Sequence, residues 1–255
     1  MEPEQNQRNI LLTLAFDGTA YHGWQVQENA VTVQQTLQDA MEAVLKTRPP
    51  VKGCSRTDSG VHAYMYCCSF KTSSAIPCDS LRRALNVNLP YDISVTDCNE
   101  VAPDFHARYS CTGKEYIYKI WNSENRDPFL NGYAYFYPKR LELERMRQAA
   151  AAFIGRHDFR GFCASGSDVG HTVREVSRFE IERDGCLVTM RVRADGFLYN
   201  MVRIMTGTLL HVSRGRISPG ELPAIIESGS RSLAGPTAPA HGLYLNRVFY
   251  GTEAT

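Results

Sequence analysis

The sequence predicts a mixed α and β fold, and three observations carry that prediction. The chain up to Phe70 reads as strand, helix, strand, which is the beginning of an α/β or α+β protein. The second half contains two alternating stretches joined by Asp184–Gly185, a dipeptide typical of a β-hairpin turn. A chain of 255 residues, 43% hydrophobic and 22% charged, is long enough for one large soluble domain or two small ones.

The N-terminal half begins with a predicted strand from Ile10 to Phe16. The aromatic segment Tyr21–Gln25 follows, and we expect a loop there because the segment is too polar for the core. Thr32 then starts a helix that runs to about Thr47, with Gln35 three residues on as a capping box. One face of this helix is apolar and comprises Val33, Leu37, Met41, Val44 and Leu45.

The remaining elements follow from the same patterns of periodicity, caps and turns. They are strand 61–70, helix 79–86, strands 93–101 and 114–121, helix 141–154, strands 175–183 and 187–194, helices 198–212 and 218–228, and a strand that ends at Tyr250. The loop 122–138 is rich in Asn, Pro and aromatic residues and is the best candidate for a boundary. We therefore predict a flexible N-terminus at 1–9, an N-terminal half at 10–135 and a C-terminal half at 136–255.

Composition argues against several classes of protein. The longest apolar runs are far shorter than the roughly 18 residues that a membrane span needs, and no basic-then-apolar signal peptide opens the chain. The eight cysteines include no Cys-x-x-Cys pair and do not resemble a disulfide framework or a zinc site. We expect no membrane partner and a reducing, cytoplasmic location.

The net charge of +1 conceals local excesses of positive charge. Between Arg48 and Arg83 six basic residues stand against two acidic ones, and residues 196–216 contain Arg203, Arg214 and Arg216 with no acid. Two such regions could follow a phosphate backbone if they converged. For any single residue among them, an ordinary solvated surface position is the simpler explanation.

The segment Gly53–Ala63 carries the most chemistry, because it places a carboxylate, a guanidinium and an imidazole in one short stretch. Gly53 and Gly60 can adopt positive φ, so we expect them to hold Asp58 at the tip of a bent chain. An aspartate presented in this way can attack an electrophile or accept a proton. Capping of a turn is the alternative role, and it is what most Asp-Ser-Gly triplets do.

Other catalytic patterns do not fit. The sequence has no phosphate-binding Gly-rich loop, no His-x-His or His-Glu-x-x-His spacing and no Gly-x-Ser-x-Gly motif. An aspartic protease needs two carboxylates that share a proton, and this chain has no second Asp-Ser/Thr-Gly. Polar Arg56 and Thr57 also stand where a protease would have an apolar strand.

The segment Arg56–Ala63 resembles the catalytic motif of the tRNA pseudouridine synthase A family, the enzymes that isomerise uridines in the anticodon arm of tRNA. The resemblance continues in order along the chain from about Leu12 to Tyr250. It includes Phe16–Gln25, Thr32–Gln34, Leu89–Pro90, Phe105–Arg108, Lys114–Tyr118, His157–Phe159, Gly196–Arg203 and Gly242–Leu245.

The resemblance implies roles for five residues. Asp58 is the expected nucleophile, which attacks while the base is detached, rotated and rejoined through carbon. Arg203 is the arginine that pairs with it and favours the ionised carboxylate. Tyr116 matches the aromatic that stacks on the flipped uracil and acts as a catalytic residue in the final proton transfer. Arg56 suits the space that the flipped base leaves, and His62 completes the substrate-binding set.

The resemblance also implies an α+β fold of two similar α/β halves, each a mainly antiparallel sheet backed by helices, with the active cleft between them. The implied partner is the anticodon arm of tRNA, with target uridines 38, 39 and 40, and the implied assembly is a homodimer. Neither a metal nor an organic cofactor is expected, because the isomerisation is redox-neutral.

The chain departs from the family pattern beside the catalytic motif. Met65–Tyr66 stands where a Gly-Gln pair is common, and Ser55 stands where glycine is frequent. The departures leave open a divergent paralogue that acts on another RNA uridine. Two further alternatives are a non-catalytic RNA-binding protein on the same fold and a hydrolase that uses Asp58 on a nucleoside or peptide.

Overall fold

The computed structural model describes residues 7–166 and 170–251. The chain forms two compact units: unit 1 consists of the segment up to Thr112 and the segment from Leu245 onward, and unit 2 consists of Gly113–Tyr244. The predicted boundary at residue 135 differs from this division. Residues 114–121 of β5 (Cys111–Trp121) pair with β9 (Leu187–Ala194) along their whole length, so most of that strand belongs with the C-terminal elements.

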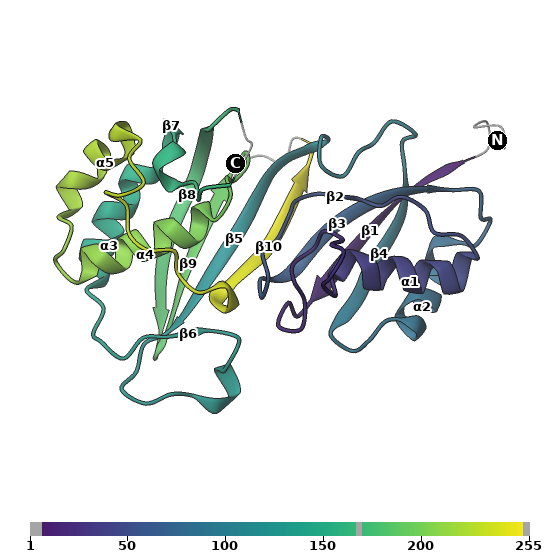
Figure 1. The fold of residues 1–255 in the computed structure, drawn as a ribbon, viewed down its shortest axis with the longest axis horizontal. Helices are drawn as coiled ribbons and strands as arrows, with labels where there is room; N and C mark the ends of the chain where they lie inside the picture. The colour runs from purple at the N-terminus through teal and green to yellow at the C-terminus, as the bar shows by residue number, and fades with distance from the viewer. Residues whose placement is uncertain (1–6, 167–169, 252–255) are drawn as a thin grey trace. The chain divides into compact units, whose positions relative to one another are not determined.

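Unit 1 contains an antiparallel sheet in which β1 (Arg8–Phe16) lies between β3 (His62–Thr72) and β4 (Ile93–Val101). The short β2 (Lys52–Gly53) pairs with β3. Helices α1 (Val33–Leu45) and α2 (Cys78–Asn88) contact each other, and α2 packs on β4 (Figure 1). The core of the unit comprises apolar side chains from both layers, among them Leu12, Leu14, Leu37, Met41, Leu81 and Leu85.

The Thr32 cap predicted for α1 is present at its start. The Thr32 side chain accepts a hydrogen bond from the Gln35 amide, and Lys46 ends the helix in the left-handed conformation with φ 60°. A flexible segment predicted at 1–9 is wrong for its last two residues, and residues 1–6 lie outside those described. Arg8 already belongs to β1, where it donates to the Ile76 carbonyl oxygen at 2.8 Å and to the Glu100 carboxylate at 2.7 Å.

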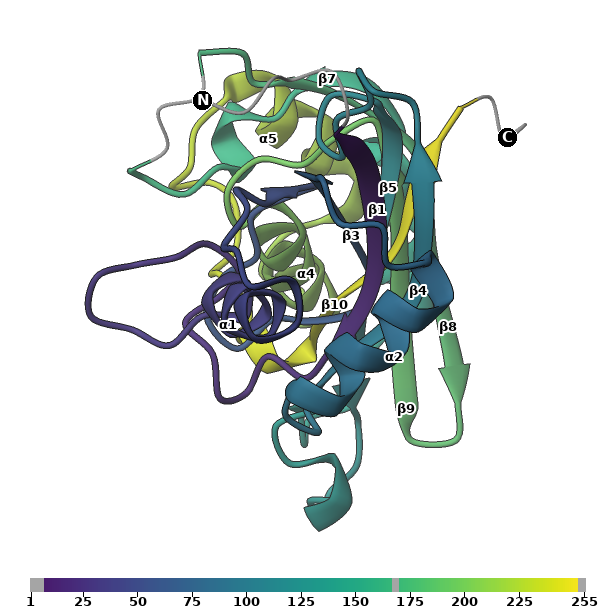
Figure 2. The ribbon, with the colours of Figure 1, turned by 90° about the vertical axis from the view of Figure 1, so that its right-hand side faces the viewer.

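Unit 2 contains strands in the order β5, β9, β8 (Val173–Asp184) and β7 (Gly155–Asp158), each antiparallel to the next, with β6 (Tyr135–Phe136) parallel to β5. Its helices are α3 (Leu143–Ala150), α4 (Met201–Ser213) and α5 (Leu222–Ser228). They lie on one side of these strands in both views (Figures 1 and 2), and α3 packs against α4 and β8. The unit is therefore an antiparallel sheet backed by helices, as predicted.

Three details of unit 2 bear on the predictions. The hairpin turn has Gly185 at φ 55°, as the Asp184–Gly185 signal indicated. The helix expected at 141–154 ends earlier, because α3 stops at Ala150 and a 3₁₀ turn follows at Ala151–Phe153. Strand β7 has only four residues and a polar sequence, so no alternation could have indicated it.

The last strand, β10 (Leu243–Tyr250), begins at the end of unit 2 and continues as part of unit 1. Within unit 1, Tyr250 Oη donates to the Ala107 carbonyl oxygen at 2.8 Å, and Thr112 Oγ1 donates to the Phe249 carbonyl oxygen at 3.2 Å. Both ends of the chain therefore contribute strands to this unit. None of the helices in the described ranges is both long and apolar enough to cross a bilayer.

Candidate active site

Asp58 is the first residue of a tight turn that leads into β3. The Val61 amide donates to the Asp58 carbonyl oxygen at 3.1 Å, and Gly60 has φ 76° at the third position of the turn. Only glycine adopts that conformation without strain, so the predicted use of Gly60 is confirmed. Asp58 itself lies just before the bend rather than at its tip, with its side chain half-buried.

The segment 17–24 packs against this turn, through backbone contacts that leave no room for a side chain at Gly18 or Gly23. The Gly60 amide donates to the Tyr21 carbonyl oxygen, and the Trp24 amide donates to the Thr57 carbonyl oxygen, both at 3.3 Å. A methyl group on Gly18 would lie 2.0 Å from the Val61 carbonyl oxygen, and one on Gly23 would lie 2.2 Å from that of Thr57. Backbone contacts this close fix the position of the Asp58 turn relative to the segment 17–24.

His62 is buried, with 1% of its surface exposed, and contacts the same supporting segment. The Gly18 amide donates to His62 Nδ1 at 3.1 Å, and Asp17 Oδ1 lies 3.1 Å from the same nitrogen. One nitrogen cannot accept from Gly18 and donate to Asp17 at once, and we assign Nδ1 as the acceptor because a buried amide needs a partner. This burial favours a supporting role for the imidazole, and its predicted contact with substrate stays a prediction.

The aromatic segment Tyr21–Gln25 is a loop, as predicted, but two of its rings are buried in the core while His22 and Gln25 are exposed. Trp24 is 3% exposed and stacks on Tyr66 with 4.0 Å between ring centroids, while Tyr21 Oη donates to Asp92 Oδ1 at 2.6 Å. The expectation that the segment is too polar for the core was wrong because the Tyr21 hydroxyl finds a partner in Asp92 and the Trp24 ring packs on Tyr66. Gly53 does not adopt positive φ either: a methyl group there would lie 2.5 Å from Trp24 Nε1, so this glycine makes room for the stack.

The departures from the family pattern contact one another. Tyr66 is fully buried, and its hydroxyl donates to the carbonyl oxygen of Ser55, three residues before Asp58. Next to this contact, Arg56 is exposed, and Thr57 Oγ1 is buried with no hydrogen-bond partner among the described residues. The hydrogen bond between Tyr66 and Ser55 thus holds the backbone that leads to the Asp58 carboxylate.

The basic stretch of unit 1 is less available than its sequence indicated. Arg48 forms ion pairs with Asp39 at 2.6 Å and with Glu42 at 3.0 Å, and Arg82 lies 3.5 Å from Asp79. Arg83, like Arg56, is exposed. Neutralised arginines contribute little to phosphate binding, so the excess of positive charge here is smaller than the count predicted.

In unit 2, Arg203 is held rigidly in the first turn of α4. Its Nε donates to the Ala238 carbonyl oxygen at 2.7 Å, and its Nη1 donates to Asn200 Oδ1 at 2.6 Å. Asn200 immediately precedes the helix in the left-handed conformation, with φ 60°. These contacts fix the orientation of the guanidinium, and half-burial of the side chain excludes a freely solvated arginine.

Tyr116 and Tyr118 lie on one face of β5, beside the segments that hold Arg203. Tyr116 is 6% exposed and makes an edge-to-face contact with Phe197, with 5.0 Å between centroids. Tyr118 is fully buried and donates to the Pro239 carbonyl oxygen at 2.7 Å, next to the Ala238 carbonyl that binds Arg203. Burial raises the pKa of Tyr118, although the charge of Arg203 opposes this, so the assignment of Tyr118 to packing fits its surroundings.

Comparison with known proteins gives one consistent answer. The family model described as "tRNA pseudouridine synthase" matches residues 13–110 and 149–251. The chain belongs to the tRNA pseudouridine synthase family. A tRNA pseudouridine synthase A 2 from Clostridium perfringens and a tRNA pseudouridine synthase A from Acetivibrio thermocellus are each 46% identical over 243 residues, which is 95% of this chain and 100% of theirs. A tRNA pseudouridine synthase A from Caldicellulosiruptor bescii is 44% identical with the same coverage.

Because the chain belongs to this family, it is an isomerase that makes pseudouridine in tRNA. The matched ranges contain Asp58, Arg56, His62 and Arg203, whereas Tyr116 falls in the gap between them. The assignment of Tyr116 therefore rests on the sequence resemblance.

Two buried cysteine side chains of this pseudouridine synthase, Cys67 and Cys98, behave as packing groups. Burial raises the pKa of the Cys67 thiol to about 11 and that of Cys98 to about 12, so neither supplies a thiolate at neutral pH. In the described ranges, no group of three or more His, Cys, Asp or Glu side chains is arranged to hold a metal ion.

Sequence reasoning missed the residues that orient the predicted ones. Asn200 and the Ala238 carbonyl position Arg203, and Gly18 and Gly23 position the turn of Asp58. The sequence predicted this helix from residue 198, whereas α4 begins at Met201, so the place of Asn200 directly before the helix was missed. The contact with Ala238 joins positions 35 residues apart, and no local pattern indicates it.

Proposed function

We propose that this protein converts uridine to pseudouridine in the anticodon stem-loop of tRNA, with Asp58 as the nucleophile. The observation that carries the proposal is the braced turn of Asp58 in a segment that matches the family model. A nucleophile gains from being held on rigid backbone, because less ordering is then needed to reach the reactive geometry.

In the proposed reaction the Asp58 carboxylate bonds to the ribose C1′ of the flipped nucleotide while the bond between C1′ and the base nitrogen breaks, so that uracil leaves as an anion. The uracil rotates, and one of its carbons bonds to C1′ while the bond to Asp58 breaks, which regenerates the carboxylate. The proton on that carbon is then lost and the former glycosidic nitrogen gains a proton, so the product is an isomer of uridine. Arg203 favours the ionised form of Asp58, Tyr116 stacks on the uracil and takes part in the final proton transfer, and Arg56 occupies the vacated stack.

The substitution Asp58→Asn tests the nucleophile. It keeps the size of the side chain and removes the charge, so we expect pseudouridine formation to be lost while tRNA affinity changes by less than about threefold. Pseudouridine is measured by chemical mapping of an unmodified tRNA transcript, and affinity by filter binding. The matched control is Asp104→Asn, because Asp104 is exposed in the same unit. Turnover by Asp58→Asn would falsify the mechanism.

The products and their positions separate the remaining alternatives. Release of free uracil or of peptide fragments is the outcome expected of a hydrolase, and tight tRNA binding by the unaltered protein without product is that expected of a non-catalytic RNA-binding protein. Pseudouridine at uridines outside the anticodon stem-loop would indicate a divergent paralogue. The contact between Tyr66 and Ser55 gives that last alternative a specific basis, since it holds the backbone just before Asp58.

We also propose that the protein acts as a homodimer in the cytoplasm, as the family resemblance implies. Two copies would let a nearly neutral chain offer two positive surfaces to one tRNA. Sedimentation velocity of the purified protein measures the assembly, and a monomer that retains full activity would contradict it.

A further inference from the structure

A group of three arginines lies at the far end of α4 from Arg203. Arg214 and Arg216 flank Gly215, which has φ 70° and ends the helix, and Arg145 comes from α3. A methyl group on Gly215 would lie 3.9 Å from Arg145 Nη1, so the third guanidinium reaches the same turn. All three side chains are exposed. We call this group the α4-end arginines.

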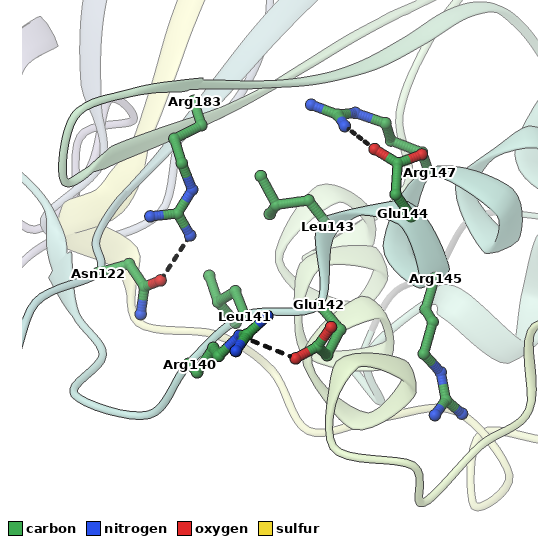
Figure 3. Close-up of a pocket in the computed structure, with 9 residues that line it drawn as sticks. All are labelled: Asn122, Arg140, Leu141, Glu142, Leu143, Glu144, Arg145, Arg147 and Arg183. Atoms are coloured by element: carbon green, nitrogen blue, oxygen red, sulfur yellow. Dashed lines mark hydrogen bonds and ion pairs between the residues drawn. The ribbon is translucent and has the colours of Figure 1, made fainter.

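The neighbouring carboxylates are already occupied by other arginines. Arg145 borders a hollow of about 440 Å³ that four arginines help to line (Figure 3). In that hollow, Arg140 Nε lies 3.1 Å from Glu142 Oε1, Arg147 pairs with Glu144, and Arg183 donates to Asn122 Oδ1 at 2.6 Å. No dashed line leaves Arg145, whose guanidinium extends away from the other three (Figure 3).

The charge of the α4-end arginines is therefore uncompensated. Within the part of the chain that the structure describes, no carboxylate lies within ion-pair distance of Arg145, Arg214 or Arg216. Three like charges on one turn repel one another, and a polyanion that binds there relieves the repulsion.

Two polar groups lie beside the turn. Tyr137 is 7% exposed, and its Oη is buried close to the Arg214 side chain. Burial raises the pKa of Tyr137 and the charges of Arg214 and Arg216 act in the opposite direction, so these guanidiniums lie near the hydroxyl. Arg216 Nη1 also lies 3.4 Å from His211 Nε2.

A structural role for the same residues has to be weighed against binding. Basic side chains in the last turn of a helix stabilise its dipole, and Arg214, Arg216 and His211 are placed to do so. That role needs one or two charges and gives no reason for Arg145 to reach the turn from another helix. It predicts a loss of stability on substitution and no change in RNA affinity.

We propose that the α4-end arginines bind backbone phosphates of the substrate RNA. The inference rests on the proposed function, because it takes the ligand to be the tRNA itself. Arg203 and Arg214 are eleven residues apart on α4, a rise of about 16 Å, so the contacted phosphates lie several nucleotides from the target uridine. Phosphate contacts fix the register of the RNA and carry no sequence information.

The test compares two double variants that each remove two positive charges from unit 2. Arg214→Gln/Arg216→Gln removes charges of the proposed surface, and Arg160→Gln/Arg178→Gln removes charges already paired with Asp158 and Glu180. We expect the first variant to raise the KM for tRNA about tenfold at low salt with kcat within twofold, and to reduce the slope of log affinity against log salt by about one to two. The control variant should change neither.

Two results would overturn the proposal. One is equal tRNA affinity and an equal salt slope in both variants. This result counts against the proposal even if the first variant is less stable to heat or binds less inorganic phosphate. The other is a fall in kcat at unchanged KM. Measuring tRNA binding directly separates this proposal from the proposed function. If the unaltered protein forms no pseudouridine, the proposed function is wrong. A loss of tRNA affinity in the first variant would still support phosphate binding by the α4-end arginines.

Discussion

At the scale of single residues, Asp158 shows how local contacts set a protonation state. Its carboxylate accepts from Arg160 Nε at 2.7 Å, from the Arg160 amide at 3.1 Å and from Thr172 Oγ1 at 2.6 Å. The hydrogen bond from Arg160 is the main cause that lowers the pKa of Asp158 to about 2. The charged form is thus preferred in the folded protein, which ties β7 to the segment before β8.

The substitution Asp158→Asn should cost about 1 kcal/mol of stability at neutral pH, a modest value because the side chain is one-third exposed. The pKa of Asp158 is lower in the folded protein than in the unfolded chain, where it is near 4, so its contribution to stability is present above pH 4 and is lost as the pH falls toward 2. The Asp158→Asn variant should lack this loss of stability between pH 4 and 2. Urea unfolding at several pH values measures it, with Asp104→Asn as the control. Equal losses in both variants would contradict the assignment.

Sequence reasoning could single out residues where chemistry is concentrated in a short motif. Arg56, Asp58 and His62 lie within one short segment, so that segment indicated all three, and their roles stay predictions. The burial of His62 and the role of Gly53 could not be predicted, because both depend on Gly18, Trp24 and other residues that only the fold brings to them.

At the scale of elements, the turn of Asp58 depends on the segment that precedes α1. Gly18→Ala places a methyl group 2.0 Å from the Val61 carbonyl oxygen, a contact that the backbone must move to relieve. We expect a loss of at least about 2 kcal/mol of stability and a loss of activity at saturating tRNA. Gly220→Ala is the control, since a methyl group there meets nothing within 4 Å. Thermal unfolding and pseudouridine formation check both, and a fully active Gly18→Ala variant would show that the turn tolerates movement.

Most elements could be predicted because each carries a strong local signal. The Thr32 cap and the Asp184–Gly185 turn both appear where the sequence placed them. Strands β2, β6 and β7 have two to four residues and no readable alternation. These short strands form because each pairs with a longer strand, β3, β5 or β8. Their formation therefore depends on the rest of the sheet and cannot be read from the short segment alone.

At the scale of the whole molecule, unit 1 is completed by residues from the far end of the chain. Phe249 is 6% exposed in unit 1, so Phe249→Ala should lower stability by about 3 kcal/mol. Hydrogen exchange should show the loss of protection chiefly in β1 and β3 of the same unit, because the cavity lies in their core. Arg247→Ala on the same strand is exposed and should have little effect. Equal loss of protection in both units would contradict the division.

The predicted boundary failed at this scale for a physical reason. A loop rich in Asn and Pro marks where the chain is irregular, whereas a compact unit is defined by which strands pair. The pairing of β5 with β9 joins residues that are more than sixty positions apart, and the return of β10 to unit 1 spans the whole of unit 2. Neither leaves a local pattern.

The place of β10 also sets an order of events during synthesis. The segment Gly113–Tyr244 leaves the ribosome as one continuous stretch, so unit 2 has all of its residues before Leu245 appears. The strands of unit 1 are made earlier but lack Leu245, Val248 and Phe249 until then. The first elements to be translated are therefore the last whose core can be completed.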